Sequence, residues 1–164
     1  MSRPVPDVPG PGQESVWDYP RPPRLERSTE HVVVRLGGAV VADTRAALRV
    51  LETSHPPTYY VPREDVDLSL LVPVARRTWC EWKGQASYAD VVAGGLQVPS
   101  GCWWYDEPTE AFAELAGAVA FYPEHVEATV DGERAQGVPG GFYGSWVTSR
   151  VAGPFKGAPG TEWW

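Results

Sequence analysis

The stretch 52–65 concentrates side chains that can exchange protons or bind anions. His55 stands before two prolines, and a third, Pro62, lies between Val61 and Arg63, with Tyr60 two residues before it. Proline fixes its own φ and favours extended backbone in the residue before it, so these side chains have a predictable direction. Imidazole exchanges protons near neutral pH, and Glu52, three residues before His55, is placed to orient it. We therefore expect His55, Tyr60 and Glu52 to form a catalytic group.

Two cationic side chains are candidates to bind an anionic group of a substrate. Arg63 offers a planar guanidinium and Lys83 a point charge, which together suit a carboxylate or a phosphate. We expect both to line one pocket with His55 and Tyr60. Each cation also has an acidic neighbour close in sequence, and solvated surface pairs of that kind are common and weak. The residues alone leave a binding role and a plain surface role open.

Aromatic residues suggest a second class of function. The chain contains eight tryptophans and seven tyrosines, many of them on or beside expected strands. Three such rings can form a cage around a cation or a flat ligand. Tyr88 and Trp104 are the rings that we expect to contact a ligand. A non-catalytic binding module is therefore the alternative to a small-molecule enzyme.

The cysteines and histidines do not predict a metal site. Neither Cys80 nor Cys102 belongs to a C-x-x-C pair, and no four ligands have zinc spacing. We expect neither a metal nor another cofactor. Side-chain alternation along an extended stretch 78–83 puts Cys80 and Lys83 on opposite faces, which disfavours a cysteine nucleophile in the same cleft. Both cysteines are interpreted as small buried apolar residues.

Short strands dominate the expected secondary structure. The stretches 31–36 and 39–42 are joined by Gly37-Gly38, which is typical of a β-hairpin. Further strands are expected at 58–61, 68–74, 78–83, 87–91, 102–105, 118–121 and 127–130. Many short strands with few helices predict a mainly β fold of antiparallel sheets.

Two short helices are expected between these strands. Asp43 is placed to cap a helix that runs to Leu51, with Arg45 and Arg49 facing water. A second helix is expected to begin at Pro108, with Phe112, Leu115 and Ala116 buried and Gly117 ending it.

The ends of the chain differ from its middle. Seven prolines fall within the first 23 positions, so residues 1–27 are expected to form a polyproline-like or disordered arm. Residues 28–137 are expected to form the folded domain. Residues 138–164 combine glycine and proline with aromatic rings, which suits a strap that buries its rings. Packing within one chain and packing in a homodimer are both compatible with this strap.

The composition of the chain limits the kinds of partner that it is expected to bind. The net charge of −7 argues against general binding of nucleic acid or of anionic membranes, because such binding uses Lys and Arg to neutralise phosphates. No apolar run approaches the roughly 20 residues of a membrane span, and the first residues do not resemble a signal peptide. We expect a cytoplasmic protein that binds a small molecule.

Several ordered motifs resemble one known family. They are Val32-Val33-Val34-Arg35-Leu36-Gly37-Gly38 through Asp43, the stretch 52–65, Cys80-Glu81-Trp82-Lys83-Gly84-Gln85-Ala86-Ser87-Tyr88 and Ala118-Val119-Ala120-Phe121-Tyr122. Glu14-Ser15-Val16-Trp17-Asp18-Tyr19-Pro20 and Gly140-Gly141-Phe142-Tyr143-Gly144 resemble parts of the longer members of the family. Together they are similar to the family named domain of unknown function 427. The resemblance implies a single β-tent domain, a fold shared with methionine sulfoxide reductase B and with the ligand-binding domain of cereblon.

The resemblance also carries a nucleotidyltransferase-like label. That activity usually shows a glycine-rich phosphate loop or paired aspartates that hold a metal, and the sequence has neither. Nucleotidyl transfer is therefore the third hypothesis, after an enzyme of unknown reaction and a binding module.

Overall fold

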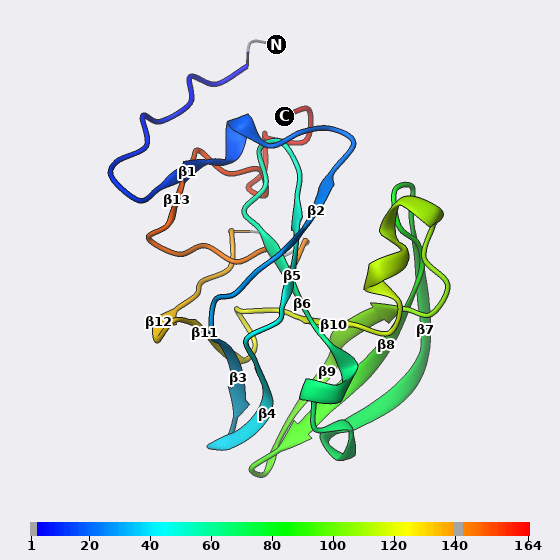
Figure 1. Cartoon of the computed structure of the whole chain (residues 1–164). Coiled ribbons are helices and arrows are strands. Elements are labelled where there is room, and N and C mark those ends of the chain that lie inside the picture. The colour runs from blue at the N-terminus through cyan, green and yellow to red at the C-terminus, as the bar shows by residue number, and fades with distance from the viewer. Residues whose placement is uncertain (1–2, 140–142) are drawn as a thin grey trace.

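A computed structural model describes residues 3–139 and 143–164 and shows a mainly β protein. Seven strands form one antiparallel sheet in the order β2-β5-β6-β10-β9-β8-β7. They are β2 (Arg24–Arg27), β5 (Leu48–Leu51), β6 (Thr58–Val61), β10 (Val119–Phe121), β9 (Leu96–Tyr105), β8 (Gly84–Ala93) and β7 (Leu71–Cys80). Figure 1 shows this large sheet running from β2 across the molecule to β7.

A second antiparallel sheet has the order β12-β11-β3-β4. Its strands are β12 (Glu133–Arg134), β11 (Glu127–Val130), β3 (Val32–Leu36) and β4 (Ala39–Thr44). The expected hairpin at Gly37-Gly38 is confirmed, since β3 pairs with β4 across that turn. The described helical segments are short 3-10 turns: η1 (Val16–Asp18), η2 (Arg63–Asp65), η3 (Leu68–Leu70) and η4 (Glu110–Leu115).

The main core uses one face of the seven-stranded sheet. Successive residues of a strand point to opposite faces, so Tyr59 and Trp104 join the core shared with the four-stranded sheet. Their neighbours Tyr60 and Trp103 belong to a second cluster on the opposite face, together with Phe112 of η4. The large sheet therefore has apolar side chains on both faces, and the second face is the one that bears the cavity described below.

The two ends of the chain lie side by side and pack on the sheets (Figure 1). β1 (Glu14–Ser15) pairs in parallel with β13 (Val151–Ala152), and β2 is the edge strand of the large sheet. Trp146 is fully buried in the main core, while the ring centroids of Trp17 and Trp164 lie 5.7 Å apart. Much of the proline-rich arm and of the C-terminal strap is thus integral to the fold.

The helix expected from Asp43 to Leu51 is wrong. β4 continues to Thr44, and β5 begins at Leu48 and pairs with both β2 and β6. Four consecutive buried residues suit a central strand that is covered on both faces, and two hydrogen-bonded neighbours outweigh the weak helical spacing. Arg49 does not face water as expected but is buried within this strand.

The other boundary predictions are met in part. The segment after Pro108 forms the 3-10 helix η4, with Phe112 and Leu115 buried but Ala116 exposed. β7 starts only at Leu71, because the preceding three residues form η3. It ends at Cys80, where a three-residue turn leads into β8.

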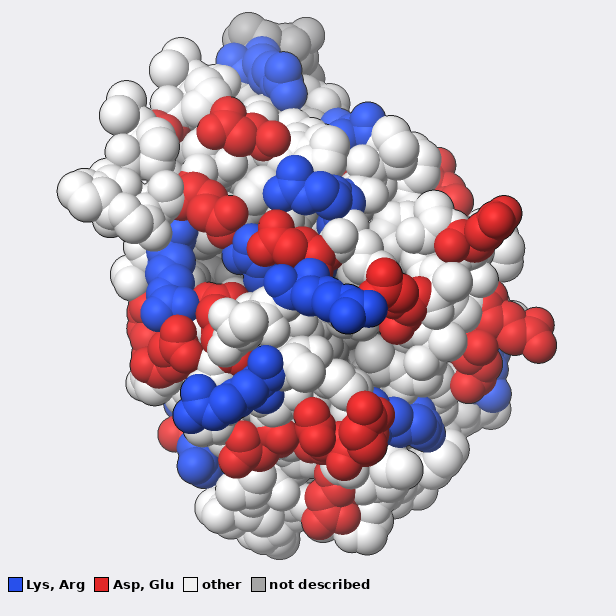
Figure 2. All heavy atoms as spheres, in the orientation of Figure 1, with Lys and Arg blue, Asp and Glu red and all other residues white. Residues whose placement is uncertain are grey.

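Charges of both signs are interspersed on the face seen in Figure 2, where blue and red side chains alternate. Ion pairs of the protein include Arg27 with Glu114 and Arg150 with Asp131. No helix among the described residues is long and apolar enough to cross a membrane.

Candidate functional site

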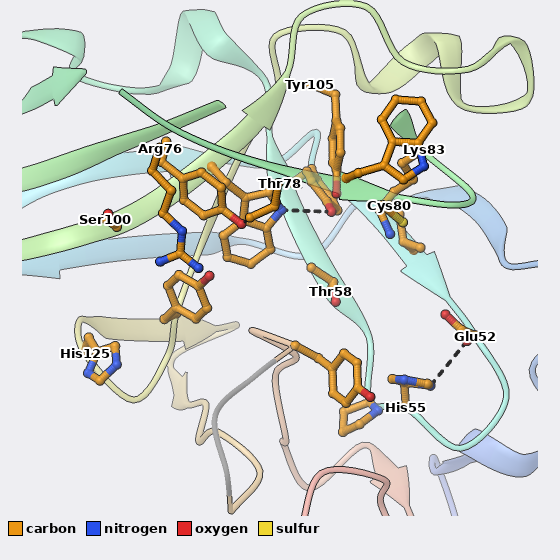
Figure 3. A pocket seen from close by; sticks show the side chains of 18 of the residues that line it. Glu52, His55, Thr58, Arg76, Thr78, Cys80, Lys83, Ser100, Tyr105 and His125 are labelled. Carbon is orange, nitrogen blue, oxygen red and sulfur yellow. Dashed lines mark hydrogen bonds and ion pairs between the residues drawn. The ribbon is translucent and has the colours of Figure 1, made fainter. Parts of the chain in front are cut away.

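A cavity of about 510 Å³ lies against the second face of the large sheet. Its volume is in the range of small-molecule sites. Aromatic rings dominate its lining: Tyr60, Trp79, Tyr88, Trp103, Tyr105, Tyr122 and Tyr143. Polar and charged residues complete it, among them Glu52, His55, Arg76, Thr78, Cys80, Lys83, Ser100 and His125 (Figure 3). The cavity thus combines flat apolar walls with a few ionisable groups.

The loop that carries His55 is held by both ends of the chain. It joins β5 to β6 and contains Ser54 in the left-handed region, with φ of 73°. The Ser54 N–H donates to the Val16 carbonyl at 3.0 Å, and the Lys156 N–H donates to the Ser54 carbonyl at 2.8 Å. The arm and the strap therefore fix the position of this histidine, although neither lies next to it in sequence.

His55 has the properties of a neutral base. Its Nδ1 lies 2.9 Å from the Thr53 carbonyl oxygen, which can only accept, so Nδ1 carries the proton and Nε2 the lone pair. Burial lowers the pKa of His55, and the nearby Glu52 carboxylate opposes this effect. At neutral pH the imidazole is consequently uncharged and able to accept a proton.

Glu52 lies near His55 but is shared with another group. Its carboxylate is 3.8 Å from His55 Nδ1, too far for a hydrogen bond, and 3.4 Å from Arg21 Nε. The Glu52 carboxylate therefore favours the protonated form of His55 through its charge and not through a hydrogen bond, and the Thr53 carbonyl provides the ring orientation that we expected from Glu52. Among the described residues no three His, Cys, Asp or Glu side chains gather as metal ligands.

Tyr60 lines the cavity but is not suited to act as a base. Its side chain is buried, and its hydroxyl accepts a hydrogen bond from Trp103 Nε1 at 3.3 Å. Burial raises the pKa of Tyr60 far above its ordinary value, so the phenol stays protonated at neutral pH. In the cavity lining it contacts Trp103 and carries a neutral hydroxyl.

Lys83 and Cys80 line the same cavity, against the expectation that they point apart. Strand alternation ends at Cys80 because residues 81–83 form a turn, and that turn is anchored by the Thr109 N–H, which donates to the Lys83 carbonyl at 3.1 Å. The Lys83 ammonium lies over the Tyr105 ring, 5.9 Å from its centroid. Cys80 and Cys102 are both free, and Cys102 is buried in the other core.

Tyr88 contributes a wall of the cavity, as expected. The Arg76 guanidinium stacks on its ring at 4.5 Å from the centroid, and its hydroxyl lies 2.8 Å from Thr78 Oγ1. Neighbouring Trp103 and Tyr122 have ring centroids 4.7 Å apart. The planes of these two rings are inclined at 46°, so they form an angled aromatic wall at one end of the cavity.

Arg63 and Trp104 lie outside this cavity, which corrects their expected placement. Trp104 faces the main core because its neighbour Trp103 faces the cavity, and its Nε1 donates to Asp106 Oδ1 at 3.0 Å. Arg63 stacks on Trp104 at 5.1 Å and donates to the Gly117 carbonyl at 3.2 Å. It lines a separate groove beside Arg27 and Arg45.

Arg76, Ser100 and His125 are cavity residues that sequence reasoning did not select. Arg76 belongs to the same face of β7 as Thr78 and Cys80, so period-two alternation from Cys80 would have found it. Ser100 and His125 come from β9 and from the segment after β10, and their approach to the cavity depends on tertiary structure.

The fold and cavity define a class of protein: a mainly β domain with an aromatic-walled pocket on one face of its larger sheet. The family described as Domain of unknown function (DUF427) matches residues 24–132, which is more than half of the chain. The chain therefore belongs to this family. A comparison with curated proteins found no match.

Proposed function

We propose that the chain is a small-molecule enzyme that uses His55 as a general base on an anionic or polar substrate. The observation that carries the proposal is the state of His55 in the cavity wall, where Nδ1–H is committed to Thr53 and burial lowers the pKa. Lys83 supplies a cation that has no carboxylate partner among the described residues. A buried neutral base and an unpaired cation in the lining of one cavity suit proton abstraction from a polar substrate.

A binding module without catalysis is the second candidate. The rings of Tyr88, Trp103, Tyr105 and Tyr122 favour it, since a flat ligand can pack against them without being changed. Arg76 and Lys83 in the same lining disfavour a cationic ligand, so the planar ligand remains. Nucleotidyl transfer, which the family label suggests, stays third because no phosphate loop or metal pair supports it.

Further properties belong to the same proposal. We propose a β-tent arrangement of the two sheets, a cytoplasmic location and function without a metal cofactor. The net charge of −7 supports the absence of nucleic acid and membrane surfaces as partners.

Replacement of His55 with glutamine distinguishes the two candidates. A metabolite extract is incubated with the wild-type protein, and compound levels are followed by mass spectrometry. We expect at least one compound to be consumed at a rate that falls about 10²-fold to 10⁴-fold in His55→Gln, which is the usual contribution of a general base. The control is His31→Gln, because His31 is paired with Asp43 and does not line the cavity.

Consumption of the same compound at equal rates by His55→Gln and the wild type would contradict catalysis by His55. A compound that is bound by the wild type and recovered unchanged would favour the binding module.

A further inference from the structure

We propose that the cavity end at Arg76 is a subsite for the carboxylate or phosphate of a planar substrate. This inference deepens the proposed function by naming a substrate class, and it rests on that function in placing the reacting group near His55. Figure 3 shows Arg76, Ser100 and His125 on one side of the view and Glu52, His55 and Lys83 on the other, with Thr58 between them. The anion subsite is thus separate from the proposed base.

A β-bulge in β7 builds the first half of this subsite. Val74 and Arg77 pair with adjacent residues of β8, so Ala75 and Arg76 between them have no partner. Two extra residues preserve the alternation of side chains, and Arg76 therefore faces the cavity. Arg77 donates to the Val74 carbonyl at 3.0 Å and to the Arg76 carbonyl at 2.8 Å, which holds the bulge in place. Bulges of this kind re-aim side chains and are frequent beside active sites.

A second bulge, in β9, lies on the opposite side of β8 from the first. Ala89 of β8 pairs with Cys102 of β9 and Val91 pairs with Val98, so β9 has two extra residues here. Pro99 and Ser100 of this bulge line the cavity. Ser100 has φ of 47°, a left-handed conformation that non-glycine residues rarely adopt. Its N–H donates to Asp90 Oδ1 at 2.8 Å. Backbone strain is often retained where it positions ligand contacts, and here both bulges flank residues 87–91 of β8.

The Arg76 guanidinium is held in position but not neutralised. It stacks on the Tyr88 ring at 4.5 Å, and it forms no ion pair with a carboxylate in the part of the chain that the structure describes. Asp90, which holds Ser100, already accepts hydrogen bonds from the Ser100 N–H and from Gln97 Nε2. Stacking covers a face of the guanidinium and leaves its N–H edges for a planar or tetrahedral oxyanion.

The neighbouring groups fit the same ligand. The Ser100 hydroxyl and the His125 ring line this end of the cavity and add hydrogen-bonding groups to the cation. The adjoining rings of Trp103 and Tyr122, inclined at 46° to each other, provide an apolar aromatic wall whose individual faces are flat. A flat ring that carries a carboxylate or a phosphate matches this combination of wall and cation, and it would extend from Arg76 toward His55.

Binding of simple aromatic anions tests the subsite. Benzoate and phenyl phosphate are titrated by calorimetry and by NMR into the wild type, Arg76→Gln and Arg45→Gln, with neutral benzamide as the uncharged probe. We expect Arg76→Gln to weaken binding of both anions about 10-fold to 100-fold, as for a lost charged hydrogen bond. Arg45→Gln makes the same change of charge at an exposed position outside the cavity and should leave the affinity unchanged.

Arg76→Lys separates charge from geometry. Lysine keeps the positive charge but lacks the planar guanidinium. The affinity of Arg76→Lys for benzoate should therefore fall between those of the wild type and Arg76→Gln. Benzamide should bind the wild type and Arg76→Gln equally. An unchanged amide NMR spectrum outside the cavity shows that each variant is folded.

Equal affinities of the wild type and Arg76→Gln for the anions would overturn the subsite, as would the absence of binding at millimolar concentrations. The two proposals fail separately. Anion binding that depends on Arg76, without any turnover, would support the subsite and contradict the enzyme proposal. Turnover that depends on His55, with anion binding that does not depend on Arg76, would support the enzyme proposal and contradict the subsite.

Discussion

Replacing Trp146 with alanine is expected to lower the free energy of unfolding by about 3–5 kcal/mol, the range for a large aromatic residue removed from a core. Trp146 is fully buried between the two sheets, and its ring centroid lies 4.9 Å from that of Tyr59. Its Nε1 donates to the Phe121 carbonyl at 3.1 Å. Alanine leaves a cavity in the core and removes the hydrogen bond to a buried carbonyl. Both effects lower the free energy of unfolding.

Trp163→Ala is the matched control, since this second strap tryptophan is 49% exposed. We expect its unfolding free energy to stay within about 0.5 kcal/mol of the wild-type value. Chemical denaturation followed by fluorescence measures both variants. Equal, small losses would show that the strap contributes little to the core.

Arg49→Met is expected to cost about 2–3 kcal/mol. The Arg49 side chain is buried, and its guanidinium donates to Glu14 at 2.8 Å and to Glu26 at 2.9 Å. Removal of one partner of a buried ion pair typically costs 3–5 kcal/mol. We expect less here because both glutamates are partly exposed and can be hydrated in the variant. This network joins Glu14 of the N-terminal arm to β5, the strand next to the edge strand β2 of the large sheet.

Arg24→Met is the control for the Arg49 variant. Arg24 pairs with Glu26 at the surface, so its replacement should cost less than about 1 kcal/mol.

Burial opposes ionisation of Glu14, but Arg49 dominates and lowers the Glu14 pKa below 4.5. A lowered pKa stabilises the fold above pH 4.5, and this contribution is lost as the pH falls through the folded-state value. The stability difference between the wild type and Arg49→Met should therefore narrow in acid; a constant difference would contradict the ion pair.

Local patterns in the sequence predict much of the sheet. The Gly37-Gly38 hairpin and strands 58–61 and 127–130 follow from alternation and turn residues, and the structure has them. The helix expected from Asp43 to Leu51 depended on apolar residues at helical spacing with Arg49 in water, whereas the structure buries Arg49 with its neighbours in a strand that is covered on both faces. Only pairing with β2 and β6 decides between helix and strand, and pairing is a long-range property.

The candidate site follows from the sequence in part. Glu52, His55, Tyr60, Lys83 and Tyr88 do line one cavity, because the proline-stiffened loop, the turn after Cys80 and β8 meet there. Arg63 was misplaced since Pro62 ends β6 and sends it to the other face. Arg76 was missed because it falls between the expected strands 68–74 and 78–83, which the structure joins as β7 with a two-residue bulge.

The protonation state of His55 tests the central claim most directly. A long-range ¹H–¹⁵N NMR spectrum, recorded through a pH titration, reports which ring nitrogen carries the proton. We predict a neutral ring at neutral pH with the proton on Nδ1, and a pKa below 6.5. A ring that is charged at neutral pH, or protonated on Nε2, would contradict the role of His55 as the base of this cavity.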